Sequence, residues 1–288
     1  MANVLLLRAP LEDSPDKYES SLRSRGYNPF SVPVLETVIV NRSELACKIG
    51  NGPKQQDFTG VIITSKRAVE AWSGVIQDLS TREHGAADWS SVPFYVVGES
   101  TASALRAIRQ TCDSPLAPKN IRGGAESGTA EALARFILND LSSTDRPRLL
   151  YLTGDKNRDT LPSTLERGGI ALDSLQVYAT QGSSRFSQDL ENTLRLAPVD
   201  LHEPWGWIVF FAPSSAEFVT PTLRSCYRFP MKESCSHPHS IPNVKIAAIG
   251  PTTAKYLQDS LCFVVAVVAP KPNPEELGDS ITSYDQQH

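Results

Sequence analysis

The 288-residue sequence lacks the features that mark several specialised classes of protein. Its five cysteines are scattered and odd in number, with no C-x-x-C pair, so we expect free thiols in a reducing compartment, the cytoplasm by default. The net charge is −4 and no run of lysine and arginine occurs, which argues against a nucleic-acid partner. No apolar run has the length of a membrane span, and the first residues lack the basic start of a signal peptide, so no membrane contact is expected.

Common catalytic signatures are missing as well. Neither G-x-x-x-x-G-K-[ST] nor G-x-G-x-x-G occurs, which disfavours a nucleotide-dependent transferase, and the G-x-S-x-G of α/β-hydrolases is absent. Cys235, His237 and His239 form a short Cys/His tract. Because this tract lies in a proline-rich stretch without a second pair of ligands at zinc spacing, we expect no bound metal.

Strand-like apolar runs alternate with helix-like stretches along nearly the whole chain. Strands are expected at 4–8, 61–64, 93–97, 148–152, 171–180, 207–211, 245–249 and 263–268. This alternation predicts α/β domains with parallel sheets and helices on both faces, whose ligands bind beyond the carboxyl ends of the strands. Two extended runs, 33–40 and 175–182, have the character of crossings between two domains. The segment 220–243 contains four prolines and is predicted to be an irregular surface excursion.

Four strand-to-helix turns carry hydroxyl groups and form two matched pairs. Their polar residues are Thr64 and Ser65, then Thr101 after Gly98, in the first pair, and Ser214, then Thr252 and Thr253 after Gly250, in the second. The first N–H groups of a helix have no partner within the helix, so such turns suit the binding of anions. The alternative is plain helix capping, in which serine and threonine are also favoured.

A few other side chains are candidates for a site because they follow or end a predicted strand. Arg8, Lys156 and Arg158 are cations placed to clamp an acid, although charges in such loops are commonly just solvated. Tyr178 is a phenol near the end of the strand 171–180. Its alternative role is that of a packed tyrosine whose hydroxyl reaches water.

Taken together, these stretches resemble the uroporphyrinogen-III synthase family of tetrapyrrole (haem) biosynthesis. The matching stretches follow the order of the family along the chain, and they include 63–71, 96–103 and 177–180. The most specific are Phe-Phe-Ala-Pro-Ser at 210–214 and Ala-Ile-Gly-Pro-Thr-Thr-Ala at 248–254. Within the former, the alanine stands where the family often has serine or threonine, so one hydroxyl of that turn is missing.

The resemblance implies an architecture. We expect two related α/β domains with flavodoxin- or Rossmann-like parallel sheets, joined by a two-stranded β ladder. The first domain would be discontinuous, formed by residues 1–36 plus 182–288. Residues 41–175 would form the second, inserted domain, and the runs 33–40 and 175–182 would be the linker strands.

The resemblance also implies a reaction. The protein would be a lyase that cyclises hydroxymethylbilane to uroporphyrinogen III, with loss of water and inversion of ring D, and without a metal or organic cofactor. Its polycarboxylate substrate would lie in the cleft between the domains, and Tyr178 would supply a proton to the departing hydroxyl. By the same match, the substrate-binding residues would be Thr64, Ser65, Thr101, Arg158, Ser214, Thr252 and Thr253.

Two expectations on partners complete the hypothesis. We expect a cytoplasmic monomer that makes, at most, a transient contact with the enzyme preceding it in the pathway. The alternative from another functional class is a non-catalytic two-domain module that binds an anionic small molecule. The presence of Tyr178, Thr101 and Thr253 favours the enzyme over that module.

Overall fold

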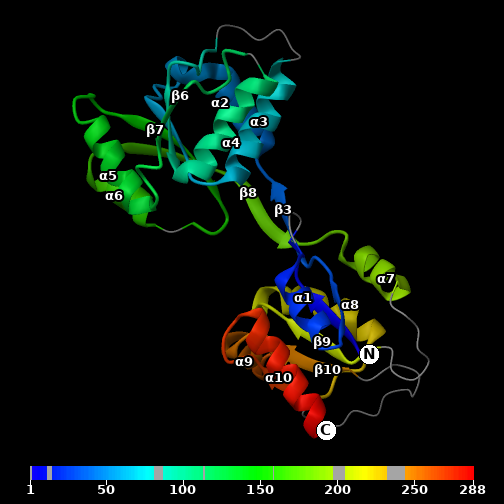
Figure 1. Cartoon of the computed structure of the whole chain (residues 1–288). Coiled ribbons are helices and arrows are strands. Elements are labelled where there is room, and N and C mark those ends of the chain that lie inside the picture. The colour runs from blue at the N-terminus through cyan, green and yellow to red at the C-terminus, as the bar shows by residue number, and fades with distance from the viewer. Residues whose placement is uncertain are drawn as a thin grey trace. The chain divides into compact units, whose positions relative to one another are not determined.

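The chain divides into two compact units, each built around its own β-sheet (Figure 1). Unit 1 comprises Met1–Glu36 and Gln181–His288, and unit 2 comprises Thr37–Thr180. The computed structural model describes residues 2–11, 15–80, 87–112, 114–157, 159–196, 205–231 and 244–288. In both units parallel strands alternate with helices, which confirms the predicted α/β class.

The sheet of unit 1 has the strand order β11-β10-β9-β1-β2, and every neighbouring pair is parallel. Its strands are β1 (Asn3–Leu7), β2 (Asn28–Ser31), β9 (Trp207–Phe210), β10 (Lys245–Ala248) and β11 (Val267–Val268). Its helices are α1 (Lys17–Ser24), α7 (Phe186–Leu196), α8 (Pro213–Cys226), α9 (Pro251–Asp259) and α10 (Pro274–Gln287). Numbered along the chain within the unit, the order is 2-1-3-4-5, so the direction of winding reverses between β1 and β9.

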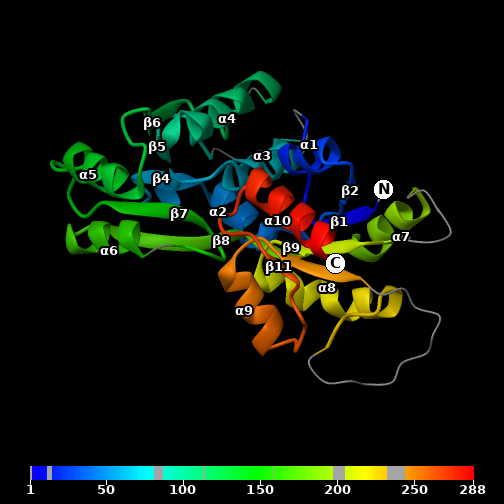
Figure 2. The same ribbon diagram turned by 60° about the horizontal axis from the view of Figure 1, so that its bottom comes forward.

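Successive side chains of β1 point to opposite faces of the sheet, and helices cover both faces. Leu5 and Leu7 pack with apolar residues of α7, α8 and α9, whereas Val4 and Leu6 pack with those of α1 and α10. Figure 2 shows α8 and α9 on one face and α1 and α10 on the other. Because successive strand residues point to opposite faces, a continuous apolar run is what a strand covered on both sides requires.

Unit 2 has the strand order β3-β8-β7-β4-β5-β6. Its strands are β3 (Leu35–Ile39), β4 (Gly60–Ile63), β5 (Pro93–Val97), β6 (Asn120–Gly124), β7 (Arg148–Gly154) and β8 (Ala171–Gly182). Its helices are α2 (Arg42–Gln55), α3 (Lys66–Ser80), α4 (Gly98–Thr111), α5 (Ala130–Asp140) and α6 (Thr160–Arg167). Without β3, the order along the chain is 3-2-1-4-5, and the winding reverses between β4 and β7. The two sheets therefore share parallel strands and a reversal point but differ in strand order.

The strands β3 and β8 each pass from one unit into the other and pair with one another. The N–H of Val40 donates to the carbonyl of Val177, and the N–H of Ser183 donates to the carbonyl of Val34. From the first pair to the second, the residue number falls in one segment and rises in the other, so the two segments run antiparallel. This pair is the two-stranded ladder that the resemblance implied.

Three elements were not predicted from the sequence: β2, α2 and β6. Helix α2 has a weak signal because Gly52 interrupts it with a left-handed φ of 76° and is followed by Pro53. Strand β6 ends in glycines because a Cβ on Gly123 would lie 2.7 Å from the carbonyl oxygen of Val96 on the neighbouring strand. Glycine is depleted in strands, so a segment that needs glycine here has a low strand propensity and was not predicted to be a strand.

The predicted excursion at 220–243 also needs correction. Helix α8 continues to Cys226, so Thr220–Cys226 is helical, in spite of Pro221, and not irregular. Residues 232–243 lie outside the described residues. Across the described ranges, we find no helix with the length and apolarity to span a membrane.

A carboxylate anchors helix α10 to the sheet of unit 1. Asp285 accepts hydrogen bonds from the hydroxyl of Tyr27 at 2.8 Å and from Nε1 of Trp207 at 2.9 Å, and it also pairs with Lys245. Burial alone would raise the pKa of Asp285, but these three donors outweigh burial and hold the pKa below its ordinary value. Burial and the bond to Asp285 raise the pKa of Tyr27 to about 12.

We predict that Asp285→Asn destabilises the protein at pH 7 by about 1–3 kcal/mol, because it weakens the acceptor of three donors. The folded pKa of Asp285 lies below the unfolded one, so the stabilisation is present above about pH 4 and is lost as the pH falls through the folded pKa. Thermal unfolding between pH 3 and 7 should therefore show that the difference in melting temperature between variant and wild type becomes smaller at the acidic end.

The control for this prediction is Asp279→Asn on the same helix. Asp279 pairs with Arg25 but is 68% exposed, so its removal should cost less than about 1 kcal/mol. Equal losses from the two variants, or a gap that does not change with pH, would contradict the role assigned to Asp285.

Candidate functional site

The carboxyl ends of the parallel strands bring the predicted hydroxyl groups together within each unit. In unit 2, the neighbouring strands β4 and β5 run into Thr64 and Ser65 and into the helix that contains Thr101. In unit 1, the neighbouring strands β9 and β10 run into the helices that contain Ser214 and Thr253. We call these two places the carboxyl edges of the units.

Two threonines at these edges have hydroxyl groups without partners among the described residues. Thr101 is 6% exposed and Thr253 is 4% exposed, yet neither side chain makes a hydrogen bond with another described residue. Neither hydroxyl oxygen is among the unpaired atoms that are fully enclosed, so each of these oxygens keeps some solvent-accessible surface. By contrast, four other buried hydroxyls bond to backbone carbonyls, namely those of Ser127, Thr153, Ser215 and Thr220, whereas the unpaired hydroxyls of Ser31 and Tyr227 are fully enclosed.

An unpaired hydroxyl in a nearly buried side chain is an unusual arrangement, because buried polar groups generally have partners. The two threonines occupy corresponding places, each in the first turn of the helix that follows a strand. Each unit therefore presents a hydroxyl that is fixed by packing and available to a ligand.

The helices at the carboxyl edges also leave their first N–H groups without side-chain caps. No side chain caps α4, α8 or α9, and their capping positions are Val97, Ala212 and Gly250. Helices α2 and α6 are uncapped as well, whereas α1, α5 and α10 are each capped by a side chain of their own. Uncapped N–H groups carry partial positive charge and are donors for anions.

Ser65 behaves differently from the other predicted residues. Its hydroxyl oxygen accepts a hydrogen bond at 3.3 Å from the N–H of Ala68, so it caps the start of α3. Thr64 is half-buried. Burial raises the pKa of Tyr151, and the nearby Thr64 side chain opposes that rise. Of the two predicted residues, Ser65 therefore already has a structural bond. At the other edge, Ser214 and Thr252 are exposed.

Tyr178 is placed by the backbone of the adjacent strand. It lies on β8 opposite Gly154, where a bulge shifts the register of the β7–β8 pair. A Cβ on Gly154 would lie 2.4 Å from two ring atoms of Tyr178, so only glycine permits this close approach. The guanidinium of Arg67 lies 5.8 Å from the centre of the same ring. The hydroxyl of Tyr178 makes no hydrogen bond with another described residue.

Two neighbours of the predicted residues were missed by the sequence reasoning. Arg67 is exposed and follows Ser65 by two residues, and Tyr151 lies on β7 beside Thr64. Both stand within or next to stretches that were singled out, but nothing in the sequence places either of them beside another tyrosine or hydroxyl. Their positions follow from the pairing of β4, β7 and β8.

Two further predictions fall partly or wholly on residues that are not described. Arg158 lies outside the described residues, as do Cys235, His237 and His239. In the described ranges, no group of three or more His, Cys, Asp or Glu side chains could hold a metal ion. The absence of a metal cofactor therefore stays a prediction.

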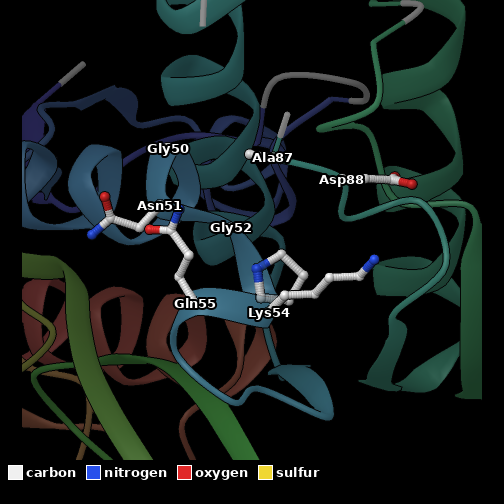
Figure 3. Close-up of a pocket in the computed structure, with 8 residues that line it drawn as sticks. Gly50, Asn51, Gly52, Lys54, Gln55, Ala87 and Asp88 are labelled. Carbon is white, nitrogen blue, oxygen red and sulfur yellow. The ribbon is translucent and has the colours of Figure 1, made fainter. Parts of the chain in front are cut away.

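Unit 2 contains a pocket with a volume of about 360 Å³ (Figure 3). It is lined by Gly50, Asn51, Gly52, Pro53, Lys54, Gln55, Ala87 and Asp88. The end of α2 that forms it directly precedes β4, so the pocket lies at the amino end of the strands, away from the carboxyl edge. None of the predicted site residues lines it.

Comparison with known proteins gives one consistent result. Residues 16–279 match the model of a family described as "Uroporphyrinogen-III synthase HemD". The chain is 32% identical over 284 residues to uroporphyrinogen-III synthase of Saccharomyces cerevisiae, covering 95% of this chain and 93% of that protein. It is 30% identical over 291 residues to uroporphyrinogen-III synthase of Schizosaccharomyces pombe, covering 100% and 99%.

Solved structures with the same description are also similar to this chain. The crystal structure of uroporphyrinogen-III synthetase from Helicobacter pylori is 17% identical, covers 98% of this chain and 99% of its own, and has a TM-score of 0.47. A mutant uroporphyrinogen III synthase from the extremely thermophilic bacterium Thermus thermophilus is 17% identical, covers 100% of both chains, and has a TM-score of 0.40.

The packing of Tyr178 on Gly154 can be tested by mutation. We predict that Gly154→Ala destabilises the protein by about 1–3 kcal/mol, because the added methyl group forces the ring to move. Removing the ring in Gly154→Ala/Tyr178→Ala should abolish most of that additional cost, which denaturant unfolding in a double-mutant cycle measures.

Gly128→Ala is the matched control in the same unit, since a Cβ there meets nothing within 4 Å. Its effect should be small. Additive losses from Gly154→Ala and Tyr178→Ala would show that the two residues do not constrain one another.

Proposed function

The chain belongs to the uroporphyrinogen-III synthase family, and from this premise we propose that it converts hydroxymethylbilane to uroporphyrinogen III. The protein is accordingly a lyase of haem biosynthesis that closes a linear tetrapyrrole with loss of water and inversion of ring D. The observation that carries this function is the match over residues 16–279, together with identities of 30% or more over the full chain. A non-catalytic binding module is not favoured, because the similar proteins of full length are synthases.

The donors at the carboxyl edges suit a substrate that carries many carboxylates. We propose that acetate and propionate groups of the substrate bind to the hydroxyls and uncapped N–H groups of each edge. The proposed substrate-binding residues are Thr64, Ser65, Thr101, Arg158, Ser214, Thr252 and Thr253. Among these, Thr101 and Thr253 have the strongest support, because their hydroxyls are held by packing and lack partners among the described residues.

The net charge of −4 is compatible with an acidic substrate. Backbone N–H groups at a helix start donate to carboxylates without adding formal charge to the protein. Hydrogen bonds with a charged partner are about twice as strong as neutral ones, so several such donors suffice to hold a polycarboxylate.

The reaction needs orientation more than chemical activation. Unassisted ring closure gives the non-inverted isomer, so the enzyme must position the two ends of the chain and favour attack at the substituted carbon of ring D. The departing hydroxyl needs a proton, and we propose Tyr178 as its donor. Two observations support this role: Gly154 and Arg67 fix the ring, and the hydroxyl has no partner among the described residues.

We also propose a setting for the reaction. The described cysteines, Cys47, Cys112, Cys226 and Cys262, are free thiols. Free thiols support a reducing compartment, and we propose the cytoplasm. We further propose that the protein acts as a monomer whose protein contact, if any, is a transient one with the enzyme that supplies the linear substrate.

An isomer assay tests both the function and the role of Tyr178. Hydroxymethylbilane is generated in the reaction mixture, the products are oxidised, and the uroporphyrin isomers are separated. We expect the wild type to form uroporphyrin III, and Tyr178→Phe to lower kcat by about 10²-fold or more through loss of general-acid catalysis, with an unchanged circular-dichroism spectrum.

The control is Tyr284→Phe, a half-buried tyrosine of unit 1 that packs on Trp207 and His288. It should leave kcat unchanged. Uroporphyrin I alone from the wild type would reject the proposed function, whereas full activity of Tyr178→Phe would reject only its role as proton donor.

A second test concerns the unpaired hydroxyl of Thr253. Thr253→Val preserves shape and removes a group without a partner among the described residues, so we expect unchanged stability. The Michaelis constant for hydroxymethylbilane should rise about threefold to tenfold, the effect of losing one hydrogen bond. Thermal unfolding and initial rates measure the two quantities.

Thr220→Val provides a closely matched comparison. Thr220 is also 4% exposed and in unit 1, but its hydroxyl donates to the carbonyl of Ala216 at 2.6 Å. This variant should lose stability and keep its Michaelis constant. The reverse pattern, in which Thr253→Val loses stability with normal kinetics, would make Thr253 a structural residue.

A further inference from the structure

Arg8 stands at the place where the sheet of unit 1 reverses its winding. It directly follows β1, which lies between β2 and β9, and the reversal falls between β1 and β9. Neighbouring strands are about 4.8 Å apart, so the first residues after β1 and β9 are close together at the carboxyl edge. In open α/β sheets this reversal point is where ligands bind.

The guanidinium of Arg8 is held in place from three sides. One of its nitrogens donates to Oδ2 of Asp16 at 2.5 Å. Its central carbon lies 5.0 Å from the ring centre of Tyr18 and 5.6 Å from that of Phe211, and these two rings are perpendicular to one another. Phe211 directly follows β9. The side chain is therefore fixed next to the turn that leads into α8, while 20% of its surface stays exposed.

The ion pair with Asp16 does not exhaust the donors of Arg8. Asp16 also accepts hydrogen bonds from the N–H groups of Leu11, Tyr18 and Glu19, so it caps α1 and shares its charge among several partners. Burial alone would raise the pKa of Asp16, but these bonds and Arg8 hold it below its ordinary value. A guanidinium has five N–H groups. Within the described residues, the Arg8 side chain donates one hydrogen bond, to Asp16, so its other N–H groups remain for a ligand.

Arg25 at the other end of α1 shows what a purely structural arginine looks like in this unit. Its guanidinium is 23% exposed, close to the value for Arg8. All three of its nitrogens are engaged, with Asp279 and with the carbonyl and hydroxyl of Ser21. The two arginines thus have similar exposure but differ in the number of donors that remain for a ligand.

We propose that Arg8 binds a carboxylate of the linear substrate at the carboxyl edge of unit 1. The proposal rests on the proposed function and adds a binding residue to it. Arginine presents two parallel N–H groups that match the two oxygens of a carboxylate, and the bond to Asp16 and the two aromatic rings fix their direction. The neighbouring turn before α8 lacks a capping side chain at Ala212, so a bound carboxylate can accept from that helix start as well.

The test compares Arg8→Gln, Arg8→Lys and Arg25→Gln with the wild type. The Michaelis constant and kcat are measured with hydroxymethylbilane generated in the reaction mixture, and uroporphyrin III is titrated as a stable ligand by fluorescence. We expect Arg8→Gln to raise the Michaelis constant and to weaken uroporphyrin III binding, each about tenfold to a hundredfold. Arg8→Lys keeps the charge without the paired geometry and should be intermediate, and Arg25→Gln should match the wild type.

A further variant separates binding from folding. Arg8→Gln leaves Asp16 with an unmatched charge, so Arg8→Gln/Asp16→Asn is made in parallel, since asparagine also caps helices well. We expect this double variant to regain thermal stability and still to bind weakly. Michaelis constants and ligand affinities of both variants within twofold of the wild type would overturn the proposal, as would a fall in kcat alone. Failure of the wild type to form uroporphyrin III would instead overturn the proposed function.

Discussion

The structure depends on one constraint, which is that parallel strands bring all their carboxyl ends to the same edge of a sheet. Helices that follow those strands then begin at that edge with N–H groups that have no partner within the helix. In this protein α4, α8 and α9 have no side-chain cap. The N–H of Gly98 donates to the carbonyl of Ser127, but the other N–H groups in the first turns of these helices have no partner among the described residues. Donors that capping would otherwise satisfy are thus left for a ligand, at some cost to the stability of each helix.

The parts of the fold that could be predicted from the sequence are those set by residues close together in the chain. The parts that could not be predicted depend on contacts between residues far apart in the chain. Apolar runs such as 61–64 and 207–211, and the turns after them, are local patterns, and the structure has strands there. Strand β6 was missed because its glycines serve a close approach to β5, which is a contact between distant parts of the chain. The chain order alone also could not show that the two sheets have different strand orders, although their turns look alike.

The features of the candidate site also divide into those that local motifs indicate and those that depend on tertiary packing. The positions of Thr101 and Thr253 followed from motifs, but their lack of partners depends on the packing of each whole helix. The fixing of Tyr178 by Gly154 depends on a register shift between β7 and β8, which no local pattern encodes. The site residues stay a prediction, but within the described residues the structure separates Thr101 and Thr253, whose hydroxyls have no partner, from Ser65, which caps a helix.

The balance of fixed and free groups argues for a site built to orient its ligand. A side chain held by packing loses little further entropy on binding, so each hydrogen bond it makes retains more of its free energy. Thr253 is held by burial, and Arg8 is held by Asp16, Tyr18 and Phe211. A reaction whose outcome depends on which carbon is attacked gains selectivity from such fixed donors, because small displacements of the substrate change the product. Rigidity at the carboxyl edges is therefore what ring inversion requires of this fold.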